Sequence, residues 1–296
     1  MTNAASLQAS PALRIMVVGY PGTAKTGMLA SLLNAGFKIR MLDFDGNPEP
    51  LLQYANPDKL QNLDIAYFED KMRLGARFTE PSGIPTAFSD ALKQMDDWKT
   101  QDAEGNPISL GASKDWGPDT IVVLDSLTSM GEAAMHRAMK LLNKTPENNT
   151  DRVWGLSMNE QLAFIKRLRA PTNRHHVIVL SHLKIISPRD ARSGDSELTK
   201  SIKQEMAEVV PTRLYPSALG WQLPQQIGKE FPILLEAEKV TKGGKTTRTL
   251  NLSPKTLLDV KFPGAIAETR LDISDGLLRV FEALSPSSVQ LVKTKE

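Results

Sequence analysis

One short run near the N-terminus constrains the fold more than any other part of this sequence. Residues 19–26 read GYPGTAKT, which matches the pattern G-x-x-x-x-G-K-S/T except that Ala24 replaces the second glycine. In such a loop the backbone N–H groups face a phosphate, the lysine reaches phosphate oxygens and the hydroxyl binds Mg²⁺. An apolar run at 13–18 precedes the loop, and residues 26–35 have apolar side chains at helical spacing. The pattern predicts a strand, a phosphate-binding loop and a helix.

We expect this loop to bind ATP together with Mg²⁺. Lys25 is a candidate catalytic residue as well, and Thr26 is a candidate metal ligand. A purely structural strand-to-helix turn with a chance Lys-Thr pair is the alternative interpretation. The candidate nucleotide-binding residues are Gly19, Tyr20, Pro21, Gly22, Thr23, Ala24, Lys25, Thr26 and Gly27.

Strand and helix patterns alternate along most of the chain. Strand patterns occupy residues 38–42, 63–68, 120–124 and 176–180, and helical patterns occupy 86–98, 129–142, 159–169 and 275–284. This alternation predicts an α/β fold with a doubly wound, mainly parallel sheet and flanking helices. Two further strand patterns, at 231–239 and 246–252, flank a Gly-Gly turn and predict a C-terminal β-hairpin extension. Residues 101–118 are polar and rich in glycine, which predicts a connection that runs along the rim of the domain. Residues 187–203 are polar and have no apolar period, which predicts a loop.

Length and composition set the domain organisation. The 296 residues suit one α/β domain better than two, so we assign 1–12 to a flexible N-terminal arm, 13–285 to a single ATPase domain and 286–296 to a C-terminal tail. No apolar run approaches the roughly 20 residues of a membrane span, and we expect a cytoplasmic protein without a membrane partner. The absence of cysteine excludes disulfides and thiol catalysis. A net charge of +2 does not by itself indicate nucleic-acid binding.

Acidic residues follow two of the predicted strands. Asp125 comes directly after the strand at 120–124, where phosphate-loop enzymes need a carboxylate to hold Mg²⁺, although it could instead cap the next helix. Asp43 and Asp45 follow the strand at 38–42. We predict that Asp45 is the catalytic base that activates water, with Asp43 as the fallback. The alternative is that these aspartates, which precede a glycine, serve as turn residues.

A histidine follows a third strand. His182 comes two residues after the strand at 176–180, on the side of the sheet where strand ends form the ligand crevice. We predict that it senses the γ-phosphate and contributes to catalysis. The alternative is a structural histidine whose hydrogen bonds are satisfied within the fold.

Together these motifs resemble the RecA-like ATPase core, and most closely the phage-encoded RecA-like single-strand annealing ATPases. The resemblance rests on residues 19–26, 41–46, 121–126 and 177–182 and spans about 13–285. It implies that Asp45 stands where RecA carries a glutamate base, and that Ser181 and His182 stand where RecA carries an Asn-Gln switch. Both are departures from the RecA pattern. It also implies a homo-oligomeric ring or filament in which Lys261 acts in trans, although Lys261 could equally be a solvated lysine.

Two hypotheses follow for the function. The favoured one is an ATP-dependent, single-stranded DNA-binding recombination protein that promotes strand annealing or pairing, in the cytoplasm of a bacterial host if it is phage-encoded. The alternative is a P-loop ATPase that acts on a protein partner, such as a helicase loader or assembly ATPase, without DNA contact. The DNA-binding loop is predicted at 185–203, where the lack of aromatic residues favours phosphate contacts, and a solvated loop is the alternative. The candidate DNA-binding residues are Lys184, Arg189, Arg192, Lys200 and Lys203.

Overall fold

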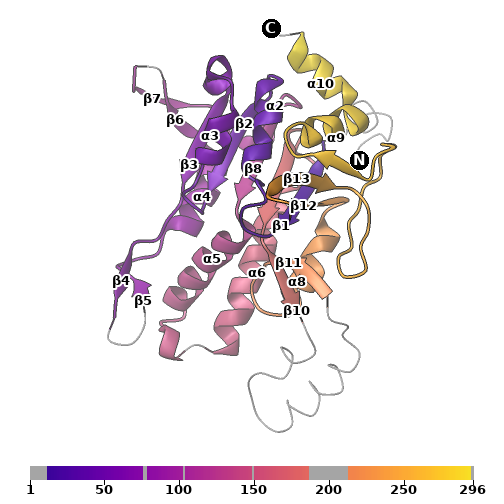
Figure 1. The fold of residues 1–296 in the computed structure, drawn as a ribbon. Coiled ribbons are helices and arrows are strands. Elements are labelled where there is room, and N and C mark those ends of the chain that lie inside the picture. Colours follow the sequence, from indigo (N-terminus) through magenta and orange to yellow (C-terminus); the bar gives the residue numbers. More distant parts are fainter. Residues whose placement is uncertain (1–11, 76–78, 103, 149, 187–212, 295–296) are drawn as a thin grey trace.

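The protein is built on an eight-stranded sheet with the strand order β14-β13-β12-β1-β9-β8-β2-β3 (Figure 1). The computed structural model describes residues 12–75, 79–102, 104–148, 150–186 and 213–294. The parallel strands are β1 (Arg14–Gly19), β2 (Lys38–Asp43), β3 (Leu63–Tyr67), β8 (Thr120–Asp125), β9 (His176–Ser181) and β12 (Ile233–Lys242). Antiparallel strands extend one edge, namely β13 (Lys245–Asn251) and β14 (Arg270–Asp272). The expected α/β class, with a mainly parallel sheet, flanking helices and a C-terminal hairpin, is confirmed.

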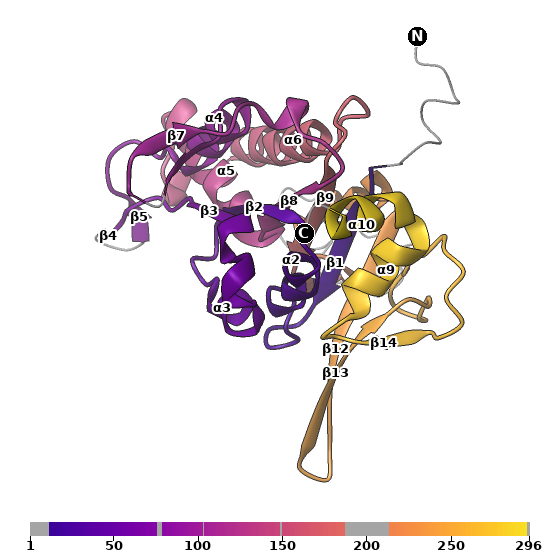
Figure 2. The same cartoon turned by 90° about the horizontal axis from the view of Figure 1, so that it is seen from above.

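Helices cover both faces of the sheet, as Figure 2 shows from above. Side chains of β8 alternate between two cores: Val122 and Leu124 pack on one face, and Ile121 and Val123 on the other. The first core includes α4 (Ala87–Asp96), α5 (Leu127–Leu141), α6 (Asp151–Leu168) and α8 (Gln222–Ile227). The second includes η1 (Gly27–Leu29), α2 (Ala30–Asn34), α3 (Glu49–Tyr54), α9 (Gly276–Leu284) and α10 (Pro286–Lys293).

Short elements fill the connections between these layers. The expected rim excursion at 101–118 contains part of a small hairpin and a 3₁₀ turn. The hairpins are β4 (Met72–Leu74) with β5 (Thr79–Pro81), β6 (Lys99–Gln101) with β7 (Pro107–Ser109), and β10 (Leu183–Ile186) with β11 (Arg213–Pro216). The 3₁₀ turns are η2 (Pro57–Asn62), η3 (Ser113–Asp115), η4 (Pro146–Asn148) and η6 (Gly228–Glu230).

The structure differs from the sequence prediction at the start of helix α6 and at the C-terminal end of the described chain. Helix α6 begins at Asp151, well before the predicted residue 159, and its first turns bury Val153 against α5. The expected C-terminal tail includes α10, because Val289 and Val292 lie at helical spacing and are buried beside α9. Most of the expected N-terminal arm, residues 1–11, lies outside the described residues. No helix in the described ranges combines the length and apolar character needed to cross a bilayer.

The parallel strands bring several of the predicted site residues to one edge of the sheet. Strands β1, β9, β8 and β2 are neighbours that run in the same direction, and Asp43 at the end of β2 pairs in register with Asp125 at the end of β8. Ligands of open α/β sheets bind beyond the carboxyl ends of the strands. The fold therefore gathers the glycine-rich loop, both aspartate motifs and His182 around one crevice.

Candidate nucleotide-binding site

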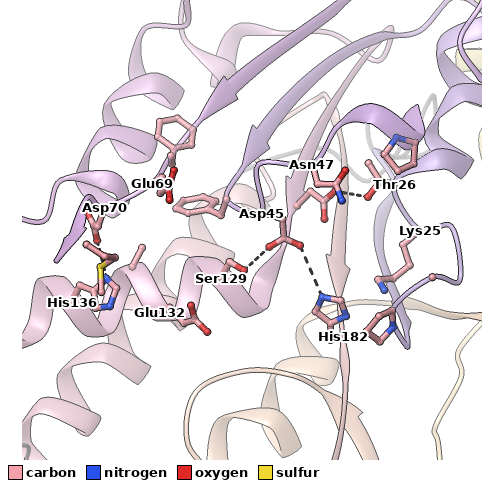
Figure 3. Close-up of a pocket in the computed structure, with 18 of the residues that line it drawn as sticks. Lys25, Thr26, Asp45, Asn47, Glu69, Asp70, Ser129, Glu132, His136 and His182 are labelled. Atoms are coloured by element: carbon pink, nitrogen blue, oxygen red, sulfur yellow. Dashed lines mark hydrogen bonds and ion pairs between the residues drawn. The ribbon is translucent and has the colours of Figure 1, made fainter. Parts of the chain in front are cut away.

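A cleft of about 750 Å³ lies at this edge of the sheet. Figure 3 shows Lys25 and Thr26 on one side of the cleft, Asp70 and His136 on the other, and Asp45 between them. Of the predicted site residues, the cleft lining includes Pro21, Gly22, Ala24, Lys25, Thr26, Asp45, Asp125 and His182. The structure thus brings together segments that are more than 150 residues apart in the sequence.

The loop between β1 and η1 has the geometry that its glycines predict. A Cβ atom on Gly19 would lie 2.6 Å from the carbonyl oxygen of Ala237, so only glycine fits there. Gly22 has a φ of +76°, in the left-handed region that glycine adopts readily. In the described part of the chain, no backbone carbonyl accepts the N–H groups of residues 24–26. These donors are available to an anion such as a phosphate.

Ala24, which departs from the glycine pattern, has a φ of +66°. A left-handed backbone costs a non-glycine residue about 1–2 kcal/mol, so the methyl group of Ala24 imposes strain that glycine would not. We expect Ala24→Gly to raise the free energy of unfolding by about 0.5–1 kcal/mol, after allowing for the larger entropy of glycine in the unfolded chain. Urea unfolding curves with an unchanged m-value would measure the gain.

A matched control for Ala24→Gly is Ala163→Gly. Ala163 is an exposed residue in the interior of helix α6, so the same change should lower stability there by about 0.5–1 kcal/mol. If both variants lost stability equally, the left-handed conformation of Ala24 would impose no strain.

Lys25 points back onto its own loop. Its ammonium group donates to the carbonyl oxygens of Gly19 at 2.9 Å and Tyr20 at 3.2 Å, and the residue is buried. Burial lowers the pKa of Lys25, and the charges of Asp125 and Asp45 partly offset that effect. Lys25 is the only lysine or arginine among the described residues that line the cleft. It is the main source of positive charge for an anion bound there.

Thr26 and Asp125 are in direct contact. The hydroxyl of Thr26 donates to Asp125 Oδ2 at 2.6 Å, which joins the loop to the end of β8. Burial raises the pKa of Asp125 to about 7, while the Thr26 hydrogen bond acts in the opposite direction. The alternative role of Asp125 as a helix cap goes instead to Ser126, whose side chain accepts the N–H of Ser129 at the start of α5. The buried carboxylate of Asp125 therefore caps no helix, and a nearby positive charge would stabilise its ionised form.

The two aspartates after β2 have different surroundings. Asp43 Oδ1 accepts the backbone N–H groups of Asp45 and Gly46, both at 2.9 Å, so Asp43 takes the turn role. Its other carboxylate oxygen is buried without a hydrogen-bond partner in the described structure, and burial raises the pKa of Asp43. The carboxylate of Asp45 accepts no N–H group of the turn and projects into the cleft. This geometry favours Asp45 over Asp43 as the residue that meets a reactant.

Three side chains hold Asp45 in place. Asp45 Oδ1 accepts the hydroxyl of Ser126 at 2.9 Å. Figure 3 shows the other two contacts: Asp45 also accepts the hydroxyl of Ser129, and Asp45 Oδ2 lies 4.0 Å from His182 Nε2. Burial, followed by repulsion from Lys25, lowers the pKa of His182 and favours its neutral form. His182 is thus positioned between the carboxylate of Asp45 and the ammonium group of Lys25.

The donor set suits a magnesium nucleotide. The Thr26 hydroxyl and the Asp125 carboxylate are oxygen ligands of the kind that Mg²⁺ prefers, and a cation would favour ionisation of the buried Asp125. Within the described residues, no group of three or more His, Asp or Glu side chains is arranged to hold a metal ion. A bound Mg²⁺ would therefore take other ligands from phosphate oxygens and water, as is usual for this ion.

The remaining predicted residues lie outside this cleft or outside the described chain. Lys261 donates from its side chain to the carbonyl oxygen of Gly228 at 2.9 Å, so in this structure it bonds to the end of α8 and is not simply solvated. Lys184 lies on β10 and donates to the carbonyl oxygen of Gly220 at 3.0 Å. Arg189, Arg192, Lys200 and Lys203 fall in the range 187–212, outside the described residues.

Sequence reasoning missed the residues that extend the cleft away from the loop. Asp70 is buried and lies 3.0 Å from His136 Nδ1, and its Oδ1 accepts the first N–H groups of α4. Glu69 and Glu132 add exposed carboxylates nearby. Asp70 and His136 are 66 positions apart, and no local pattern connects them. Ser129 was detectable, because it lies one helical turn after Ser126 at the start of α5.

Comparison with known proteins gives a family match. A family model described as "AAA domain" matches residues 12–261. No curated protein matches the chain in sequence. Among solved structures, the crystal structure of the flagellar accessory protein FlaH from Methanocaldococcus jannaschii aligns with a TM-score of 0.34 at 11% identity, covering 87% of this chain and 83% of FlaH.

Proposed function

Because the chain belongs to the AAA domain family, we propose that it is a Mg²⁺-dependent ATPase whose nucleotide binds in the cleft beside Lys25. The observation that carries this proposal is the 2.6 Å contact between the Thr26 hydroxyl and the buried Asp125, in the same cleft as Lys25 and Asp45. A phosphate loop, a metal-binding carboxylate and a second carboxylate are the parts that phosphoryl transfer to water requires.

Each side chain has a distinct role in this proposal. The loop N–H groups and Lys25 bind the phosphates. Thr26 and Asp125 would hold Mg²⁺, which would supply positive charge to neutralise the developing charge on the phosphate oxygens. Asp45 accepts a proton from the attacking water as the water oxygen bonds to the γ-phosphorus and the bond to the β–γ bridging oxygen breaks. Ser126, Ser129 and His182 orient the Asp45 carboxylate.

Phosphate release tests the proposed activity. Purified protein with ATP and Mg²⁺ should release inorganic phosphate, and chelation of Mg²⁺ should stop the release. Absence of release with ATP or GTP, with and without polynucleotide, would contradict the proposal.

We further propose that the ATPase acts on single-stranded DNA as a homo-oligomeric ring or filament. Two features support the DNA-binding part of this proposal, and the homo-oligomer rests on the resemblance to RecA-like ATPases alone. Strand β10 follows His182 directly and carries the exposed Lys184, and the sequence after β10 contains Arg189, Arg192, Lys200 and Lys203. A ligand on that segment would therefore be close in sequence to His182. An ATPase that acts on a protein partner is the competing proposal, and Lys261 stays a candidate for action in trans in either assembly.

Replacing Arg189, Arg192 and Lys200 together by alanine should weaken single-strand binding for all base sequences. Loss of about three phosphate contacts should reduce the slope of log affinity against log salt by about 2, because each contact contributes roughly 0.7. Fluorescence anisotropy with labelled oligonucleotides at several salt concentrations measures both effects, and ATP affinity should stay at the wild-type value.

The matched control for the triple variant removes three positive charges elsewhere. Lys99 on β6, Lys114 on η3 and Lys166 on α6 are exposed, and their replacement by alanine should leave the salt slope unchanged. Equal slopes in both triple variants would rule out the segment after β10 as the DNA site and favour the protein-directed function.

A further inference from the structure

The β12–β13 hairpin extends from the edge of the sheet as a narrow ribbon. Figure 2 shows it projecting from the body of the protein. Its strands meet at the two-residue turn Gly243-Gly244, where φ angles of +54° and +78° require glycine or a residue that tolerates the left-handed region. Residues 239–247 are exposed. The outer part of the ribbon therefore packs against no other part of the described chain.

The base of the ribbon lies against the phosphate loop. Strand β12 pairs with β1 up to Gly19 and Ala237, and Lys239 follows two residues later. Arg248 lies directly opposite Lys239 on β13. Arg248 Nε donates to the carbonyl oxygen of Gly22 at 3.0 Å, and a Cβ atom built on Gly22 would lie 3.9 Å from Lys239 Nζ. Both cations are therefore beside the same residue of the loop.

Lys239 and Arg248 form an unfavourable pair unless an anion joins them. Like charges directly opposite each other on one face of a hairpin are destabilising. No carboxylate in the described structure forms an ion pair with either side chain. The nearby Glu236 and Glu238 point to the other face of β12, because side chains alternate along a strand, and they pair with Lys255 and Arg270.

The cleft itself is short of positive charge. Its lining includes the carboxylates of Asp45, Glu69, Asp70, Asp125 and Glu132, whereas Lys25 is the only lysine or arginine among the described residues that line it. A nucleoside triphosphate bound at the loop would thus be surrounded mainly by negative groups. Two further cations beside Gly22 would offset this imbalance.

We propose that Lys239 and Arg248 contact the phosphates of the nucleotide held by the loop of the same chain, an inference that rests on the proposed ATP binding. Arg248 uses Nε to fix the carbonyl of Gly22, which leaves its two terminal nitrogens available for phosphate oxygens. Lys239 supplies a second positive charge beside it. The hairpin base completes the phosphate site, and Arg248 also fixes the position of the loop.

A nucleotide titration tests this assignment. Mg²⁺ complexes of fluorescent ATP, ADP and AMP analogues would be titrated into wild type and the double variant Lys239→Gln, Arg248→Gln, with circular dichroism to check folding. The affinity of the double variant for ATP should fall at least about tenfold, since hydrogen bonds to charged groups contribute on that scale. The loss should be smaller for ADP and absent for AMP. The charge-conserving single variant Lys239→Arg should retain most of the affinity, because Lys239 is assigned only a positive charge.

The matched control is Lys242→Gln with Lys245→Gln, which removes the same charge from the tip of the same ribbon. It should bind all three nucleotides with the affinity of the wild type.

Equal losses of affinity in both double variants, or no loss in either, would overturn the phosphate contact. A loss that mixing with Lys25→Ala protein restores would also overturn it, because the cations would then serve a neighbouring chain. If the wild type itself bound no ATP, both the hairpin contact and the proposed function would fail; normal wild-type binding with an insensitive hairpin variant would remove the contact alone.

Discussion

Lys25→Ala is expected to lower ATP affinity by about 100-fold and to abolish measurable turnover while the fold survives. The ammonium group is the main positive charge of the cleft, and its bonds in this structure go to two loop carbonyls rather than to the core. Two charge-assisted contacts to phosphate oxygens, at about 1.5–3 kcal/mol each, account for a loss of this size. Calorimetric titration with ATP and a phosphate-release assay would measure it.

The control for Lys25→Ala is Lys38→Ala. Lys38 begins β2 and forms a partly exposed ion pair with Asp119, so its removal should cost little stability and leave ATP binding unchanged. Thermal unfolding of both variants in the absence of nucleotide would show that the fold is intact. Wild-type ATP affinity and turnover in Lys25→Ala would disprove the role of the loop.

Asp45→Asn is expected to lower turnover by about 10²–10³-fold with little change in ATP affinity. Asparagine keeps an oxygen for the hydroxyls of Ser126 and Ser129 but accepts no proton from water at neutral pH. General base catalysis typically contributes 10²–10⁴-fold. Single-turnover hydrolysis at saturating ATP separates this chemical step from binding.

Asp125→Asn provides the contrast to Asp45→Asn. Asp125 contacts Thr26 and is assigned to Mg²⁺, so its replacement should raise the Mg²⁺ concentration needed for half-maximal hydrolysis. Asp45→Asn should leave that concentration unchanged. If single-turnover hydrolysis by Asp45→Asn matched wild type, the base assignment would pass to another carboxylate of the cleft.

Most of the sheet was predictable from the sequence because its strands are buried on both faces. Continuous apolar runs such as 120–124 and 176–180 are typical of that environment, and they became β8 and β9. The glycine turn of the β12–β13 hairpin was equally clear. The start of α6 was not predictable, because Gly155 and polar neighbours weaken the helical pattern there and packing of Val153 against α5 compensates.

The site was predictable where its residues follow strands directly. Lys25, Thr26 and Asp125 lie in one cleft, as expected from their positions in the sequence. Which of Asp43 and Asp45 projects its carboxylate into the cleft depends on which carboxylate accepts the N–H groups of the turn. The sequence does not specify this. The contact of Arg248 with Gly22 joins residues 226 positions apart, and only the pairing of β12 with β1 brings them together.

A crystal structure with a non-hydrolysable ATP analogue, with Mn²⁺ in place of Mg²⁺ for its anomalous signal, would test the central claim most directly. We predict that the phosphates lie on residues 19–26 with Lys25 turned onto their oxygens, that the cation lies between Thr26 and Asp125, and that Asp45 faces the γ-phosphate. A nucleotide bound elsewhere, or a cation that contacts neither Thr26 nor Asp125, would contradict the account.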